Sequence, residues 1–319
     1  MKKIARIIGI IVLILMIAIV CFVGYIKFFL PDISTPEGLK VDMSPANVEK
    51  GKYLANELMG CVGCHAKRDY TKFAGPIISE SKGSGGEFWG ENLGFPGSLF
   101  APNITQGSLY NWTDGEIFRA IVNGVDKEGN ALFPIMPYHQ YGKLPKEDIY
   151  AVIAYIKTLE PKPEEYPERE LNFPLNLIVN TMPQKATHHL KPDANDLVKH
   201  GEYIITAAVC FDCHTPMEKG RFIEEMAYAG GAEFKFESGG IVRSANLTPD
   251  KETGIGNWTK KQFVQRFKAY ADSNFIFEKL WPPAILILIC PGNIMPTFKE
   301  RDLEAIYAYL MSLDPIKIR

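Results

Sequence analysis

Cysteine and histidine are scarce in this sequence, since each occurs only six times among 319 residues. At that composition a Cys-x-x-Cys-His pattern would arise by chance about 0.002 times in the chain. The sequence nevertheless contains two copies, "CVGCH" at Cys61–His65 and "CFDCH" at Cys210–His214. Two chance occurrences are not credible, so both pentapeptides must have a chemical role.

The N-terminal segment lacks acidic side chains, and its run Ile7–Ile26 lacks charge altogether. Twenty apolar residues match the length of about 20 that a helix needs to cross a bilayer. Lys2, Lys3 and Arg6 precede the run, so the positive-inside rule keeps the N-terminus in the cytoplasm. The sequence predicts a single-pass anchor over residues 1–30, in a bacterium in the inner membrane with the rest in the periplasm. A cleaved signal peptide is the alternative, but its apolar core is normally shorter.

The segment after this run has no surplus of positive charge. Four of the 35 basic residues precede Pro31, whereas all 37 acidic residues follow it, which leaves six more acidic than basic residues. A nucleic-acid partner would require a concentrated basic face. The composition therefore argues against nucleic acid and permits a protein partner.

An internal repeat organises the segment that follows the apolar run. Five blocks occur in the same order in both halves. The pairs are "GKYLANELMGCVGCH" from Gly51 with "GEYIITAAVCFDCH" from Gly201, "FAGP" from Phe73 with "YAGG" from Tyr228, "APNITQGSLYNWT" from Ala101 with "SANLTPDKETGIGNWT" from Ser244, "PIMPYHQ" from Pro134 with "NIMPTFK" from Asn293, and "YAVIAYIKTL" from Tyr150 with "LEAIYAYLMSL" from Leu303.

Both halves are typical of a mainly α fold. Apolar residues recur at helical spacing in "EDIYAVIAYIKTL", and "NWTDGEIFRAIV" begins with a cap followed by acidic residues. We expect one domain at 45–160, a second at 195–319, and a linker at 161–194 that starts proline-rich and charged. The later part of the linker is too apolar to be an unpacked, solvent-exposed segment. We expect its apolar side chains to pack against the domains, namely Phe173, Leu175, Leu177 and Ile178.

The spacing of the motifs suits covalent haem attachment. Two cysteines on one helical turn can form thioethers with one haem, while the adjacent histidine binds the iron. A zinc site would instead need the distant pairs Cys61/Cys64 and Cys210/Cys213 to converge, and it would leave His65 and His214 without a role. A redox dithiol lacks its strand-helix-strand context. Haem is the preferred interpretation, with zinc and a redox pair as the alternatives.

Both halves resemble c-type cytochrome domains. The two Cys-x-x-Cys-His motifs, "PNIT", "ANLTPDKETGIGNWT", "FPIMPYHQYGKLPKEDIYAVIAYIKTL" and the "IMP" before the last helix carry the resemblance, which covers roughly Gly51 to Leu313. The whole is similar to membrane-anchored dihaem cytochromes c, including cytochrome subunits of periplasmic alcohol and sugar dehydrogenases. The resemblance implies two tandem cytochrome c domains, each with one covalently bound haem c.

The resemblance also implies a methionine as the second axial ligand of each iron. Met136 and Met295 stand at equivalent places, each followed by a proline that stiffens the loop. His139 is the competing ligand for the first iron. An unusual apolar insertion that contains Cys290 precedes Met295, and a buried strand, a haem-pocket wall or a docking patch would explain it.

Other residues take weaker assignments. We expect His188, His189 and His200 to be surface or structural residues. By analogy, two tryptophans and two asparagines line haem edges or bind propionates, or else serve as caps and core: Trp112, Trp258, Asn103 and Asn246. We expect a backbone carbonyl at Gly75-Pro76 to accept the ring N–H of His65.

The resulting functional prediction is one-electron transfer without catalysis, because a six-coordinate iron has no vacant position for substrate. Expected donors are a dehydrogenase or a quinol-oxidising complex, and expected acceptors are a terminal oxidase or a soluble cytochrome. A dihaem enzyme of the peroxidase or thiosulfate dehydrogenase type, with one open or unusually ligated iron, is the alternative.

Overall fold

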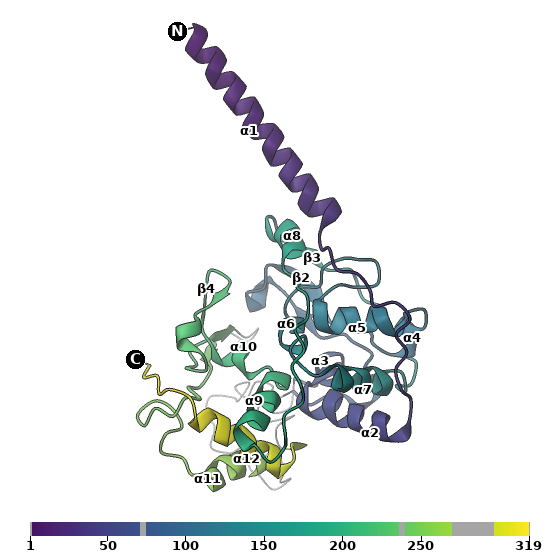
Figure 1. Ribbon diagram of the computed structural model, residues 1–319, viewed down its shortest axis with the longest axis vertical. Helices are drawn as coiled ribbons and strands as arrows, with labels where there is room; N and C mark the ends of the chain where they lie inside the picture. Colours follow the sequence, from purple (N-terminus) through teal and green to yellow (C-terminus); the bar gives the residue numbers. More distant parts are fainter. Residues whose placement is uncertain (1, 71–74, 236–239, 270–296, 319) are drawn as a thin grey trace.

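The computed structural model describes residues 2–70, 75–235, 240–269 and 297–318. Helix α1 (Lys2–Phe29) extends away from a mainly helical body, which it meets only at its C-terminal end (Figure 1). Its mean hydropathy reaches 3.3 and it is long and apolar enough to cross a membrane.

The N-terminal half of the body is built on helices α2 and α7, which pack side by side. At their crossing a Cβ on Gly51 would lie 1.8 Å from the carbonyl oxygen of Ala151, so only glycine permits this approach. Helix α5 begins with a capping box formed by Thr113 and Glu116. The helices of this half are α2 (Pro45–Tyr53), α3 (Cys61–Cys64), α4 (Gln106–Leu109), α5 (Asp114–Asn123), α6 (Tyr138–Tyr141) and α7 (Lys146–Ile156).

The C-terminal half repeats this helix pair with α9 and α12. A Cβ on Gly201 would lie 2.0 Å from the carbonyl oxygen of Ala305, and Thr259 with Gln262 forms the capping box of α11. The equivalent positions of the sequence repeat thus make equivalent contacts. The helices are α9 (Leu197–Ala207), α10 (Cys210–His214), α11 (Lys260–Lys268) and α12 (Glu300–Met311).

One difference between the halves follows from their lengths. Gly51–His65 is one residue longer than its counterpart Gly201–His214. Helix α2 continues into a π-helical turn at Leu54–Leu58, whereas α9 continues as a regular α-helix. A π-turn accommodates one extra residue without moving the flanking segments. Both motifs therefore start from the same relation to their helix pair.

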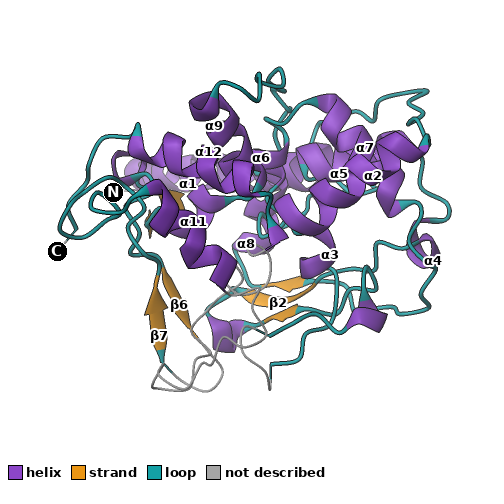
Figure 2. Cartoon of the chain, turned by 90° about the horizontal axis from the view of Figure 1, so that it is seen from below, coloured by secondary structure: helices purple, strands orange, loops and turns teal. Residues whose placement is uncertain are grey.

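Short antiparallel strands and single turns fill the loops (Figure 2). Strand β2 pairs with β1 on one side and with β3 on the other, so the linker contributes a strand to the N-terminal half. The strands are β1 (Phe88–Trp89), β2 (Gly97–Phe100), β3 (Glu170–Leu171), β4 (Met217–Glu218), β5 (Arg221–Phe222), β6 (Glu233–Lys235) and β7 (Ile241–Arg243). The 3-10 turns are η2 (Ser79–Ser81), η3 (Glu91–Leu93), η4 (Val179–Thr181) and η5 (Glu224–Met226), and helix α8 spans Leu175–Ile178.

The two halves meet through reciprocal hydrogen bonds. The Tyr53 hydroxyl on α2 donates to Asp302 on α12 at 2.5 Å, and the Tyr203 hydroxyl on α9 donates to Asp148 on α7 at 2.7 Å. Each aspartate also binds a cation or histidine of its own half. Lys50 lies 2.7 Å from Asp148, and His200 lies 2.8 Å from Asp302.

The apolar part of the linker only partly packs on the body. Leu175 and Leu177 are half-buried, but Phe173 is 79% exposed and Ile178 is 41% exposed. The expectation that all four pack inward is wrong for Phe173 and Ile178. The reason is that β3 and the buried Val179 already hold the segment, which leaves these two side chains facing outward.

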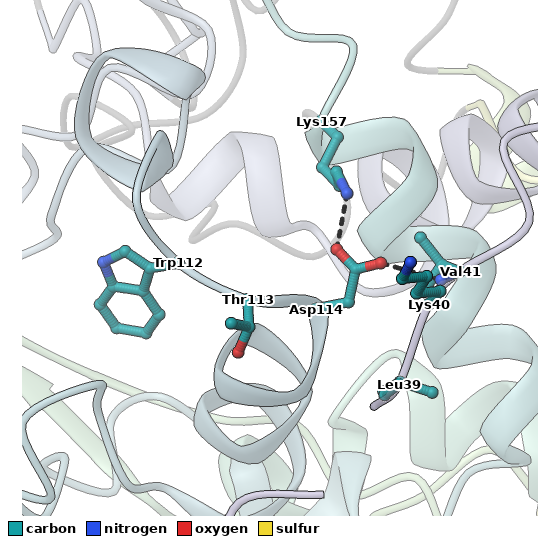
Figure 3. A pocket seen from close by; sticks show the side chains of 7 residues that line it. All are labelled: Leu39, Lys40, Val41, Trp112, Thr113, Asp114 and Lys157. Carbon is teal, nitrogen blue, oxygen red and sulfur yellow. Dashed lines mark hydrogen bonds and ion pairs between the residues drawn. The ribbon is translucent and has the colours of Figure 1, made fainter. Parts of the chain in front are cut away.

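A strap, residues 30–44, connects α1 to the body. Arg119 donates to the carbonyl of Ile33 at 3.3 Å, and the Val41 amide donates to Asp114 at 2.8 Å. Asp114 also lies 2.6 Å from Lys157 (Figure 3). An open cavity of about 420 Å³ lies beside this ion pair, and its lining contains no residue of either Cys-x-x-Cys-His motif.

Candidate functional site

The first motif forms a single helical turn. Gly60, with φ of 63°, starts α3 in the left-handed region. The amide of Cys64 then donates to Gly60, and the amide of His65 donates to Cys61. Cys61 is buried and Cys64 is exposed, and burial raises the pKa of the Cys61 thiol to about 12. The turn therefore presents both sulfur atoms and the imidazole from one short segment.

The backbone determines which nitrogen of His65 is available. Its Nδ1 lies 2.7 Å from the carbonyl oxygen of Pro102. A carbonyl only accepts hydrogen bonds, so Nδ1 carries the proton and donates it. Burial lowers the pKa of His65, so the ring is neutral at pH 7. The lone pair of Nε2 is left for a metal ion.

The expected carbonyl at Gly75-Pro76 is therefore wrong for His65. The Gly75 carbonyl accepts from Arg68 at 3.1 Å, and the Pro76 carbonyl accepts from the amide of Asp69. These bonds close a local loop next to the motif. The acceptor for His65 comes instead from 37 residues farther along the chain.

The second motif repeats this arrangement. In α10, Nδ1 of His214 lies 2.8 Å from the carbonyl oxygen of Ala245, which leaves its Nε2 lone pair for a metal ion as in His65. Val209 takes the place of Gly60 and holds the same left-handed backbone, with φ of 58°. A β-branched residue is strained in that region. The strain indicates that the start of the motif requires this conformation irrespective of the residue present.

Two asparagines hold the loops that carry these carbonyls. Asn103 directly follows Pro102, and its Oδ1 accepts from the amide and the hydroxyl of Thr105, both at 2.8 Å. Its amide group donates to the carbonyls of Lys162 and Glu164, so its hydrogens are used within the chain. This supports the structural alternative for Asn103 rather than a propionate contact.

Asn246 makes the same bonds after Ala245. Its Oδ1 accepts from the amide and the hydroxyl of Thr248, at 2.9 and 2.7 Å. Its amide group donates to Thr253 and to the carbonyl of Ile316. Of the two tryptophans, Trp112 lines the cavity in Figure 3 and is half-buried against the core, while Trp258 is 36% exposed.

The segment that follows Met136 contacts the second motif. Met136 is half-buried against the core, and its amide donates to the carbonyl of Phe133 in a turn. Three residues later, Nε2 of His139 lies 2.8 Å from Asp212, and Gln140 donates to the same carboxylate at 2.7 Å. His139 is thus directed at the second motif. Asp212 is one of the two variable residues inside "CFDCH".

This bridge was not anticipated from the sequence. Its only signal was a carboxylate inside one motif and a histidine after the methionine of the other half, and neither pattern specifies a partner. Met295 and Cys290 lie outside the described residues.

The remaining histidines take structural positions. Nδ1 of His188 lies 2.8 Å from the carbonyl of Leu144, and burial lowers its pKa. His200 binds Asp302 at the interface, and His189 is exposed. These positions agree with the expected surface and structural roles.

The donor set can be compared with the alternatives. All four motif cysteines and both motif histidines are described, and nowhere in the described ranges do three or more His, Cys, Asp or Glu side chains gather as a metal cluster would require. The convergent zinc site is therefore not formed. Two separate turns, each with one oriented imidazole, fit two haem groups better.

Comparison with known proteins gives no matching family model. It does find relatives. The alcohol dehydrogenase (quinone), cytochrome c subunit, of Gluconacetobacter polyoxogenes is 27% identical over 300 residues, which cover 86% of this chain and 58% of that protein. The fructose dehydrogenase cytochrome subunit of Gluconobacter japonicus is 28% identical over 84% of this chain and 52% of its own length. The chain is similar to the cytochrome c subunits of dehydrogenases.

The relatives differ in how much of their own length this chain covers. A diheme cytochrome c-type protein of Cereibacter sphaeroides is 24% identical over 62% of this chain and 73% of its own length. The cytochrome subunits are longer, and the chain spans little more than half of the two named above. The named relatives are cytochromes or cytochrome subunits, which agrees with an electron carrier.

Proposed function

We propose that this protein is a membrane-anchored dihaem cytochrome c that transfers single electrons. In this proposal α1 is a retained single-pass anchor in a bacterial inner membrane, and the body lies in the periplasm. Two tandem cytochrome c domains, at 45–160 and 195–319, are joined by the linker at 161–194. The apolar length of α1 and the relatives' names support this assignment.

The observation that carries the proposal is the matched pair of histidine–carbonyl bonds. Pro102 and Ala245 hold His65 and His214 as neutral rings with Nε2 available, each directly behind two cysteines on one turn. Such an outer contact fixes the ring orientation and raises the basicity of a ligating imidazole. A redox dithiol needs no oriented histidine, and a zinc site would need more ligands than gather around either turn in the described part of the chain.

The residues take the following roles. Cys61 and Cys64 would hold the first haem covalently, and Cys210 and Cys213 the second. His65 and Met136 would bind the first iron, and His214 and Met295 the second. When bound, haem c supplies the one-electron iron couple. A turn holds the backbone of Met136, whose amide donates to the carbonyl of Phe133, and Pro137 stiffens that turn. Saturated ligation leaves no position for substrate, so the protein is a carrier rather than an enzyme.

We further propose the direction of electron flow by partner class. A periplasmic dehydrogenase or a quinol-oxidising complex donates electrons, and a terminal oxidase or a soluble cytochrome accepts them. The dehydrogenase class is supported by the names of the relatives, which are subunits of alcohol, fructose and gluconate dehydrogenases.

The test is spectroscopic and uses the full-length protein expressed with haem attachment. We expect two haems per chain, both low-spin, with the red-region absorption band that methionine gives to ferric haem. Met136→Ala and Met295→Ala should each remove about half of that band. Met43→Ala, an exposed methionine before α2, is the control and should leave the band unchanged. A high-spin haem in the unmodified protein would contradict the carrier and support the dihaem enzyme.

A further inference from the structure

Exposed apolar side chains occur on both segments that meet where α1 reaches the body, and these side chains are termed the apolar patch. They are Phe28, Phe29, Phe173 and Ile178, which are 76%, 69%, 79% and 41% exposed. Single exposed apolar residues are common on protein surfaces, but several gathered around one contact between elements mark an interaction site. Two of these residues belong to the end of α1 and two to the linker, so their proximity depends on the fold.

The linker touches the end of α1 directly. Helix α8 and turn η4 lie against α1 (Figure 1). Val179 and Ile26 are buried in this contact region, and Asn180 donates to the carbonyl of Ile26 at 3.3 Å. The position of Phe173 and Ile178 relative to the last turn of α1 is therefore set by packing.

The length of α1 gives the depth of this contact in a membrane. A helix rises 1.5 Å per residue, so the 20 uncharged residues of Ile7–Ile26 extend about 30 Å, the thickness of a hydrocarbon core. Lys27 is the first charged residue after the run. The last turn of α1, and with it α8, then lies at the level of the lipid headgroups.

The strap prevents the body from swinging away from that level. It follows α1 without a break and is tied to α5 through Ile33 and Val41. Asn180 provides a third tie, directly on α1. The body therefore presents the same side to the bilayer.

We propose that Leu171–Ile178, together with Phe28 and Phe29, forms a second membrane contact that inserts into the headgroup region of the bilayer. The occupant of this surface is lipid, because the patch is continuous with the membrane helix and lies at the depth where aromatic side chains favour the interface. The exposed Asn172 and Asn176 alternate with the apolar residues and remain hydrated among the headgroups. The inference rests on the proposed membrane anchoring and adds an orientation of the electron-transfer body.

The test uses the full chain in nanodiscs of phosphatidylethanolamine and phosphatidylglycerol that contain a phospholipid with a photoreactive group near the headgroup end of its acyl chain. After illumination, labelled peptides are mapped by mass spectrometry. We expect label in α1 and, at least fivefold above the body's background, in 171–178. Leu190 is the internal control because it is 94% exposed, and its neighbour Lys191 binds Asp148 on α7, away from α1 (Figure 1).

The outcomes separate the two proposals. Label in α1 with none in 171–178 overturns the second contact and leaves the anchor intact, whereas an unlabelled α1 overturns both. Label on Leu190 equal to that on 171–178 also overturns the second contact. The second contact is likewise overturned if residues 171–178 are protected from hydrogen exchange only when a dehydrogenase partner is added, and not by lipid.

A variant pair adds an independent check. Phe173→Glu combined with Ile178→Glu should remove most label from 171–178 and raise its hydrogen exchange in nanodiscs, while α1 stays labelled. Leu190→Glu is the matched control and should change neither. Circular dichroism verifies the fold of both variants, and the labelling of the unmodified chain decides the proposal if the double variant does not fold.

Discussion

The hydroxyl of Tyr53 donates a 2.5 Å hydrogen bond to the carboxylate of Asp302, which lies 249 residues away in the other half of the chain. The equivalent residues of the repeat, Tyr203 and Asp148, make the reciprocal bond. Each half thus supplies one donor and one acceptor to the interface. The sequence repeat is expressed as an approximate two-fold relation between α2/α7 and α9/α12.

Removal of either tyrosine hydroxyl should destabilise the folded protein. Tyr53→Phe leaves one oxygen of the buried Asp302 without that donor, which costs about 1–3 kcal/mol. The free energy of unfolding, measured by chemical denaturation, checks this. Tyr155→Phe is the control, because its hydroxyl makes only a 3.4 Å contact to Asn56 within one half. Equal losses in both variants would rule out a special contribution from the interface bond.

The interface should also make stability depend on pH. Burial alone would raise the pKa of Asp148, but the bond from Lys50, the charge of Lys191 and the bond from Tyr203 together lower it. A carboxylate with a lowered pKa stabilises the fold above its unfolded pKa of about 3.9, and this contribution is lost as the pH falls through the lower folded value.

The free energy of unfolding, measured at intervals of about 1 pH unit from pH 6 downward, should show this loss. Asp148→Asn should lower stability at pH 6 and flatten its fall below about pH 4. Asp314→Asn, an exposed carboxylate near the C-terminus, should retain the unmodified slope. An Asp148→Asn slope equal to that of the unmodified protein would show that this carboxylate is not responsible.

The glycine crossings should tolerate no side chain. In Gly51→Ala the new Cβ overlaps the Ala151 carbonyl, and the two helices must separate, which costs about 1–3 kcal/mol or more. Gly201→Ala should behave alike at Ala305. Thermal unfolding checks both, with Lys52→Ala on the exposed face of α2 as the control. Unchanged unfolding of the glycine variants would contradict the close crossing.

The bridge between the Met136 loop and the second motif should appear as coupling. His139→Ala and Asp212→Asn remove the same 2.8 Å contact, so the double variant should lose less stability than the two single losses added together, by about 0.5–3 kcal/mol. His139→Ala combined with Asp250→Asn, which lies in a separate loop, should be additive. Additivity in both cycles would show that the bridge does not join the halves in solution.

Much of the site was predictable from local patterns. The two Cys-x-x-Cys-His turns, the capped helices α5 and α11, and the apolar α1 follow from residue spacing that needs no knowledge of distant contacts. The repeat also places Tyr53 and Tyr203 at equivalent positions, and likewise Asp148 and Asp302. It does not reveal that each tyrosine reaches the aspartate of the other half, because equivalent positions are compatible with bonds within each half as well.

By itself, therefore, the sequence determined the two Cys-x-x-Cys-His turns, the helical character of both halves and the presence of an apolar helix, since these depend on composition and on periodicity along the chain. Only the tertiary structure decided that Pro102 and Ala245 hold the histidines, that His139 reaches Asp212, and that Phe173 is exposed. Those contacts join segments tens to hundreds of residues apart, and their partners are selected by the packing of whole helices rather than by any local pattern.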